Sequence, residues 1–309
     1  MEAGYIIVLI NKKEHNMKIA VSSYSYNQYI STGEMSQLDA VKKAAEQGFD
    51  GIEFTELRPN NDRNASYDSQ LAYAEDIRRE VEKYGIEVSS YVVGANLYSG
   101  NAEADAKEVD RLCGQLRIAK ALGAKIFRHD VCYSEKVDGR VIGYDRMLPT
   151  IAANARKVTE YAETLGIITC TENHGYIAQD SDRVEKLFNT VAHDNYGLLV
   201  DMGNFACADE DSARAVSRLA PYAVHVHAKD FHKIPFSAPE VEGEKSFRTR
   251  GFNRLVGCAV GDGDIPVAQC LAILKKAGYD GYIVIEFEGS GECFGEIEKG
   301  RSFLLENLK

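Results

Sequence analysis

The 309-residue sequence lacks tryptophan, has six prolines and contains no long apolar run. A membrane helix needs about 20 consecutive apolar residues, so we expect no membrane partner. The early run at 5–10, "YIIVLI", is too short for a signal-peptide core, and no small-residue cleavage site follows it. The seven cysteines show no C-x-x-C spacing. Such unpatterned thiols are typical of a reduced, cytoplasmic protein rather than a disulfide framework.

Positive charge is also scarce. The chain has 36 Lys and Arg residues against 47 Asp and Glu residues, a net charge of −11. A surface this acidic repels phosphate backbones, so nucleic acid is not expected as a partner. A small anionic substrate held by a local basic loop remains compatible with this balance.

One local pattern recurs along the chain: a helical stretch, then a glycine, then a short apolar run. A glycine just past a helix takes the left-handed conformation, and the apolar run that follows is typical of a buried strand. The glycines are Gly48, Gly85, Gly123, Gly166 and Gly278. The pattern predicts strands at 18–23, 50–54, 86–92, 125–129, 167–172, 196–201, 222–228 and 282–287.

Eight strands that alternate with helices predict an α/β protein, a single-domain (β/α)8 TIM barrel. A doubly wound open sheet is the alternative, weakened because no G-x-G-x-x-G follows the first strand. The folded pattern begins at "MKIAVSS", so we expect the barrel at 17–309 and an extension outside the fold at 1–16. The stretch 231–263 is expected to be a long loop between the last two strands.

The last four predicted strands each end on a side chain that can bind a metal: Glu172, Asp201, His227 and Glu286. The C-terminal strand ends of such a barrel carry the chemistry, so these groups should meet. Two unit charges 4 Å apart repel by about 4 kcal/mol at an effective dielectric near 20. A divalent cation removes that conflict, and a set of carboxylates with one imidazole suits Mn²⁺, Mg²⁺, Co²⁺ or Zn²⁺. We therefore predict one divalent metal ion, with Mn²⁺ as the first expectation.

The segments "GFDGIEF", "TENHG", "VDMGN", "HVHAKD" and "GYDGYIVIEFEG" occur in this order. With them the chain resembles the xylose isomerase-like barrel superfamily, and its sugar phosphate isomerase/epimerase branch most of all. The resemblance extends over nearly the whole chain from Met17. It implies that one divalent metal is bound by the matching Glu172, Asp201, His227 and Glu286. It also makes His225 an inward neighbour that supports the site rather than a ligand.

The resemblance implies isomerisation or epimerisation of a sugar, sugar phosphate or inositol derivative. Such a reaction removes a proton beside a carbonyl through a metal-stabilised enediolate. Glu172 and Glu286 are the expected acid/base pair, with Glu288 as the rival of Glu286. The side chains expected to bind the substrate or support the site are Glu53, Arg128, His129, Asn173, His174, Asn204, Lys229 and Arg250. For Glu53, a substrate hydroxyl and a pairing with Arg128 are left as equal alternatives.

The sequence departs from the ketohexose 3-epimerase pattern at three positions, which here are Ala178, Asn204 and Lys233. We therefore expect this chain to share the metal ligands of those enzymes but not their free ketohexose substrate. An inosose dehydratase or a keto-inositol isomerase with the same metal set is the alternative. The basic side chains of 231–263 could grip a phosphate or carboxylate, or belong to a solvated surface loop.

Two hypotheses belong to other classes. The first is a barrel that binds a polyol without turning it over. The second is a DNA-repair endonuclease of the same superfamily, which would need several metals and a basic groove. The first three predicted strands hold no histidine, and the net charge has the wrong sign for that function. The sequence leaves the oligomeric state open, a homo-oligomer included.

Overall fold

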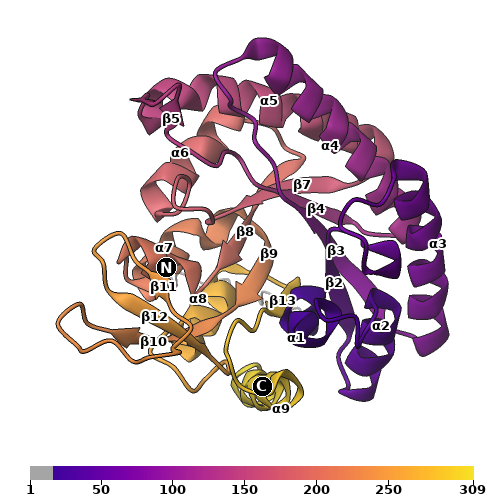
Figure 1. The fold of residues 1–309 in the computed structure, drawn as a ribbon, viewed down its shortest axis with the longest axis vertical. Helices are drawn as coiled ribbons and strands as arrows, with labels where there is room; N and C mark the ends of the chain where they lie inside the picture. The colour runs from indigo at the N-terminus through magenta and orange to yellow at the C-terminus, as the bar shows by residue number, and fades with distance from the viewer. Residues whose placement is uncertain (1–16) are drawn as a thin grey trace, which may run out of the picture.

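The computed structural model describes residues 17–309, and the predicted extension at 1–16 lies outside the described residues. Eight parallel strands close into a barrel in the order β1-β13-β9-β8-β7-β4-β3-β2 (Figure 1). The strands are β1 Lys18–Ser22, β2 Gly51–Thr55, β3 Glu87–Val93, β4 Ile126–His129, β7 Ile168–Glu172, β8 Tyr196–Asp201, β9 Ala223–Ala228 and β13 Tyr282–Ile285. The bounds agree with the predicted strands to within two residues, and the single-domain (β/α)8 TIM barrel is confirmed.

Helices surround the barrel (Figure 1). They are α1 Asn27–Ile30, α2 Gln37–Glu46, α3 Tyr67–Tyr84, α4 Ala102–Leu122, α5 Tyr144–Leu165, α6 Ser181–Val191, α7 Ser212–Leu219, α8 Val267–Ala277 and α9 Cys293–Asn307. Short 3-10 turns lie at η1 Ser23–Tyr26, η2 Pro59–Asn61, η3 Asn204–Ala208 and η4 Ala220–Tyr222. In α5 the residues Met147, Ile151, Ala155 and Val158 form one fully buried stripe, which is the face that packs on the barrel.

The five glycines of the recurring pattern all have positive φ, between 67° and 89°. At Gly166 the left-handed residue closes α5, and its N–H donates to the carbonyls of Ala162 and Glu163. The chain then enters β7 directly. The glycine therefore ends the helix and starts the strand at a defined position.

The segment 231–263 differs from its prediction as a long loop, because it carries an antiparallel sheet. Its strands are β10 Asp230–Ile234, β11 Phe247–Arg248 and β12 Arg254–Cys258, in the order β10-β12-β11. Phe231 and Leu255 are its buried apolar anchors. Buried and exposed residues do not alternate along β10 and β12, so no period of two marks these strands in the sequence. A two-stranded hairpin, β5 Lys136–Val137 and β6 Arg140–Val141, precedes α5.

Side chains alternate between the two faces of each barrel strand. One face contributes to an apolar layer, and the other contributes polar groups to the barrel mouth. Tyr91 and Phe127 belong to the apolar cluster, and their rings lie 6.0 Å apart. Their strand neighbours Ser90 and Arg128 take the opposite face, because successive side chains on a strand point to opposite sides. The buried polar groups of that face include Glu53, Ser90, Arg128, Glu172, Asp201, His225, His227 and Lys229. Within residues 17–309, no helix has the length and apolar character required to cross a bilayer.

Candidate metal centre

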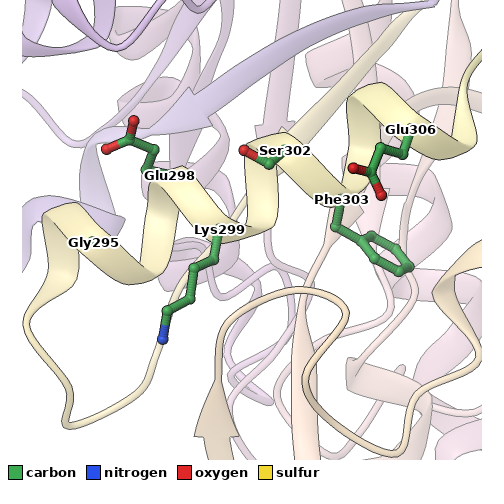
Figure 2. Close-up of a pocket in the computed structure, with 6 residues that line it drawn as sticks. All are labelled: Gly295, Glu298, Lys299, Ser302, Phe303 and Glu306. Carbon is green, nitrogen blue, oxygen red and sulfur yellow. The ribbon is translucent and has the colours of Figure 1, made fainter.

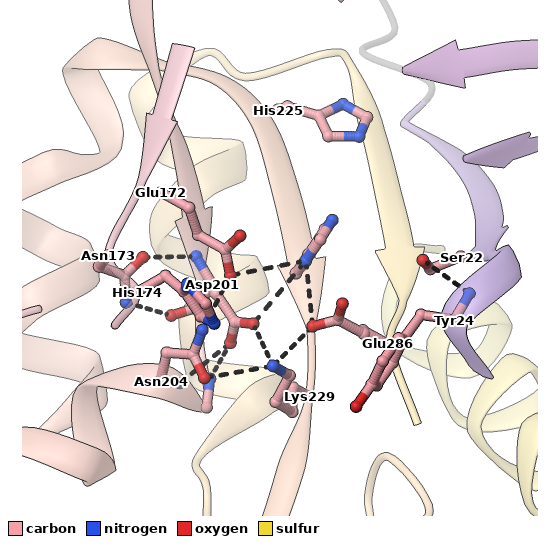
Figure 3. A network of polar contacts seen from close by, with 12 residues as sticks. Ser22, Tyr24, Glu172, Asn173, His174, Asp201, Asn204, His225, Lys229 and Glu286 are labelled. Carbon is pink, nitrogen blue, oxygen red and sulfur yellow. Dashed lines mark hydrogen bonds and ion pairs between the residues drawn. The ribbon is translucent and has the colours of Figure 1, made fainter. Parts of the chain in front are cut away.

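The ends of four neighbouring strands bring the predicted ligands together. Glu172 is the last residue of β7, and Asp201 lies opposite His227 in the pairing of β8 with β9. Glu286 follows β13 and donates its backbone N–H to Ala228 at 3.1 Å. One ligand atom from each of Glu172, Asp201, His227 and Glu286 lies within 4.8 Å of the others. Figure 3 shows the side chains of Glu172, Asp201 and Glu286 pointing into the same region.

The orientation of His227 decides which of its ring nitrogens faces this point. Nε2 lies 2.9 Å from the Glu53 carboxylate, and since a carboxylate only accepts, Nε2 carries the hydrogen. In the neutral ring Nδ1 then keeps its lone pair, and it lies 3.4 Å from Oε2 of Glu286. Nδ1 is buried and makes no hydrogen bond within residues 17–309, whereas Oδ2 of Asp201 faces the Lys229 ammonium at 3.1 Å.

A buried nitrogen without a hydrogen bond is costly, and a cation would satisfy Nδ1 of His227. One imidazole nitrogen and three carboxylates are also a donor set that divalent metals accept. The residues present therefore fit a divalent metal ion.

Glu53 lies behind His227 rather than at the open mouth. It is fully buried and accepts hydrogen bonds from Ser90 at 2.6 Å and His225 at 3.2 Å, in addition to His227. Burial would raise the pKa of Glu53, but the two histidines hold this pKa well below its usual value. Of the two predicted contacts, a pairing with Arg128 is replaced in the described residues by hydrogen bonds from Ser90 and the two imidazoles. A carboxylate behind a metal-binding histidine fixes the ring and its tautomer.

Polar neighbours hold Glu172 and Asp201 in place. Asn204 donates its side-chain amide to Oε1 of Glu172 at 2.8 Å, and Arg128 lies 2.8 Å from Oε2. Burial raises the pKa of Glu172. Oδ1 of Asp201 accepts from the backbone N–H groups of Gly203 and Asn204 at 2.7 and 3.0 Å. Asn173, also predicted for the site, bonds the backbone of Asp201 through both ends of its amide.

Lys229 is a buried cation beside the ligands. Its Nζ lies 2.5 Å from Oε2 of Glu286, 3.1 Å from Oδ2 of Asp201 and 3.4 Å from Oε1 of Glu288. Burial would lower the pKa of Lys229, but these carboxylates hold it well above its usual value. For Glu286, burial acts to raise the pKa, and Lys229 and His227 together bring it well below the usual value. Glu286 belongs to the four-residue cluster, whereas Glu288 lies one step further out.

On the Glu172 side, Asp130 contacts the predicted residues Arg128 and His174 but was not itself predicted. Asp130 lies 2.7 Å from Arg128 and accepts a hydrogen bond from Nδ1 of His174 at 2.9 Å. Burial would raise the pKa of Asp130, but Arg128 and His174 lower it to about 2. The His174 side chain is 47% exposed, so its Nε2 is accessible at the mouth. The sequence signal for Asp130 is weak, a single acidic residue directly after β4.

The network holds more negative than positive charge. The carboxylates of Glu53, Asp130, Glu172, Asp201, Glu286 and Glu288 face the permanent cations Arg128 and Lys229. Buried carboxylates without compensation would take up protons. An additional cation at the centre would keep them ionised.

Two predicted substrate contacts lie elsewhere. His129 is buried, donates Nδ1–H to the Asp130 carbonyl at 2.8 Å, and has its ring 6.2 Å from that of Phe127. It therefore faces the helix layer rather than the mouth. Arg250 lies 2.6 Å from Asp180 at the entry to α6 and bonds the backbone of Tyr176. It is not among the groups that contact the four ligands.

The fold and centre together define a parallel (β/α)8 barrel with a metal-compatible site at the C-terminal strand ends. A family model described as "Xylose isomerase-like TIM barrel" matches residues 41–306, and the chain belongs to this family.

Relatives of the chain are known at low identity. It is 30% identical over 224 residues to the rhizopine catabolism protein MocC of Rhizobium meliloti, covering 69% of this chain and 66% of that protein, just under two thirds. It is 25% identical over 265 residues to the inosose dehydratase of Mesomycoplasma hyopneumoniae strain J, covering 83% of this chain and 82% of that enzyme.

A similar solved structure is the D-psicose 3-epimerase of Clostridium cellulolyticum H10 with D-tagatose. It has a TM-score of 0.71 and 17% identity, with 95% of this chain and 100% of that chain covered. At that identity the likeness shows the fold. The inosose dehydratase relatives are enzymes, in agreement with the prediction of an enzyme.

Proposed function

We propose that the chain is a metal-dependent enzyme that removes a proton beside the carbonyl of a keto-polyol, and that the overall reaction is the dehydration of a keto-inositol. The observation that carries this proposal is the meeting of four ligand atoms within 4.8 Å, with Nδ1 of His227 buried and making no hydrogen bond within residues 17–309. The inosose dehydratase relatives favour this substrate class.

Glu172, Asp201, His227 and Glu286 would hold the metal ion. Mn²⁺ is the first expectation, and Mg²⁺, Co²⁺ and Zn²⁺ are the alternatives. When bound, the ion supplies the Lewis acidity that polarises a substrate carbonyl and makes the neighbouring C–H acidic.

Two carboxylates are available to take the proton. Glu172 and Glu286 come from β7 and β13, with β8 and β9 between them in the barrel. Glu172 is the better candidate base, because Arg128 and Asn204 fix its two oxygens and its buried environment favours proton uptake. The reacting carbon would lie between the two carboxylates.

Dehydration also needs a proton donor for the departing hydroxyl. The C–H electron pair forms the new C=C bond, the C–O bond of the β-hydroxyl breaks, and the oxygen leaves as water. His174 is placed to give that proton, because Nδ1–H is held by Asp130 and Nε2 is left at the mouth. Asp130 supports the protonated ring: burial would lower the pKa of His174, and the bond to Asp130 raises it overall.

Epimerisation is the second candidate, because two carboxylates on separate strands could exchange a proton across one carbon. The positions that depart from the ketohexose 3-epimerase pattern argue against a free ketohexose. Ala178 is buried and apolar, Asn204 is bonded to Glu172, and Lys233 borders a different hollow beside Asp209 and Ile234.

The proposal is tested in D₂O with metal-loaded protein, an inosose and a panel of ketoses. NMR reports deuterium uptake beside the carbonyl, and loss of the substrate hydroxyl reports dehydration. Glu172→Gln should reduce both by at least about 100-fold. Glu298→Gln, at an exposed position on α9, is the matched control and should retain full activity.

Deuterium uptake without loss of water would favour epimerisation. If neither occurs with any inosose or ketose, the proposed function is wrong.

A further inference from the structure

A hollow of about 710 Å³ lies beside the metal centre. Its walls come from η1 and α1, from the loop after β13, and from the start of β11. Glu288 lines it and lies 3.4 Å from Lys229, which in turn contacts Glu286. Tyr24 also lines the hollow, and Figure 3 shows its ring next to Glu286. The hollow therefore borders the Glu286 side of the centre.

The wall offers uncharged hydrogen-bonding groups. The hydroxyls of Tyr24, Ser246 and Ser290 and the side-chain amide of Asn27 make no hydrogen bond to any residue in 17–309. Aromatic rings of Phe247 and Phe287 lie among them. Hydroxyl and amide groups match the hydroxyls of a polyol, and aromatic faces match the C–H face of its ring.

The same wall offers an anion one exposed ammonium. Its charged lining residues are Glu244, which pairs with Arg254, Glu288, which contacts Lys229, and Lys245, which makes no ion pair within residues 17–309. The arginines of the segment 231–263 already form ion pairs. Arg254 lies 3.0 Å from Glu244, and Arg248 pairs with Glu240. No guanidinium among them remains free to bind a phosphate or carboxylate.

We propose that this hollow is a subsite for an uncharged, polyhydroxylated substituent of the substrate. The substrate class is then a keto-polyol ring that carries a second sugar or cyclitol ring through an ether-type oxygen, rather than a free or phosphorylated ring. Small-molecule sites typically span about 300–1,000 Å³, and this hollow adds a volume of that order to the room at the metal. The inference rests on the proposed function, because the metal centre is taken to hold the keto ring.

Binding can be tested without turnover by using three probes that lack a ketone. Metal-loaded protein is titrated calorimetrically with myo-inositol, its uncharged galactoside galactinol, and myo-inositol 1-phosphate. We expect galactinol to bind at least tenfold more tightly than myo-inositol, a difference of about 1.4 kcal/mol. The phosphate should bind no more tightly than myo-inositol.

Two variants test whether the tighter binding of galactinol arises in this hollow. Ser290→Trp fills the hollow from an exposed loop position and should abolish the preference for galactinol. Asn27→Ala removes the amide without filling the space and should reduce the preference several-fold. The matched control is Ser302→Trp in a second hollow of about 490 Å³ on α9, shown in Figure 2, and it should leave the preference intact.

Equal binding of galactinol and myo-inositol, tightest binding of the phosphate, or an unchanged preference in Ser290→Trp would each overturn the subsite. The D₂O experiment separates this from the proposed function. Deuterium exchange without a galactinol preference keeps the reaction and rejects the subsite. A preference that Ser290→Trp abolishes, without any exchange in either a free or a glycosylated inosose, supports the subsite and rejects the reaction.

Discussion

Replacing Glu53 by glutamine tests how the barrel interior prepares His227 for a metal. Glu53 accepts from His225 and His227 on the same oxygen, at 3.2 and 2.9 Å, and all three side chains are fully buried. A glutamine of nearly the same shape carries no charge, so its carbonyl oxygen would accept the imidazole N–H groups more weakly than the carboxylate does. The ring of His227 would then lose the charged partner that directs Nδ1 toward Glu172, Asp201 and Glu286.

The expected loss of metal affinity can be estimated from the hydrogen bond between Glu53 and His227. A hydrogen bond to a charged group contributes about 1.5–3 kcal/mol. Loss of the outer partner of a metal-binding histidine typically weakens the metal by about 10–100-fold, or about 1.4–2.8 kcal/mol. The two ranges overlap, so we expect the Kd for Mn²⁺ to rise by 10–100-fold in Glu53→Gln.

Titration calorimetry with Mn²⁺ measures this change directly. Thermal unfolding with and without the ion gives a second readout, because the stabilisation by a ligand follows its Kd. Glu56→Gln is the matched control, since it removes the same charge at an exposed position three residues further on. If Glu53→Gln binds Mn²⁺ as tightly as the parent and Glu56→Gln do, the reasoning on His227 is refuted.

The fold could be predicted because its signals are local. The helices α3, α4, α5 and α8 end at a glycine such as Gly123 or Gly166, and the apolar run that follows is short enough to be a buried strand. The C-terminal positions of Glu172 and Asp201 on their strands followed from the same pattern. All (β/α)8 barrels are closed and place the C-terminal ends of their strands at one end. The side chains at those ends were therefore expected to meet.

The partners of Glu53 could not be predicted, because they depend on how the strands stagger around the barrel. Glu53 and His225 are 172 positions apart, and β2 and β9 are not neighbours in the sheet. Local alternation shows which face a side chain takes but not which side chain stands across the interior. Asp130 escaped prediction for the same reason, since its partner His174 belongs to another loop.

The remaining predictions concern Lys229 and His129. Lys229→Gln removes a cation that competes for Asp201 and Glu286, so it should bind Mn²⁺ at least as tightly as the parent while turnover falls; weaker binding would contradict this. For His129, burial lowers the pKa to about 4, against about 6.5 in the unfolded chain. The unfolded state therefore binds more protons between these values, and stability is lost as pH falls from 6.5 through 4. The difference corresponds to about 3 kcal/mol. In His129→Phe this titration is absent, so the free energy of unfolding, measured in urea at pH 7 and pH 4.5, should fall less than in the parent. Equal losses would show that His129 does not titrate as its burial requires.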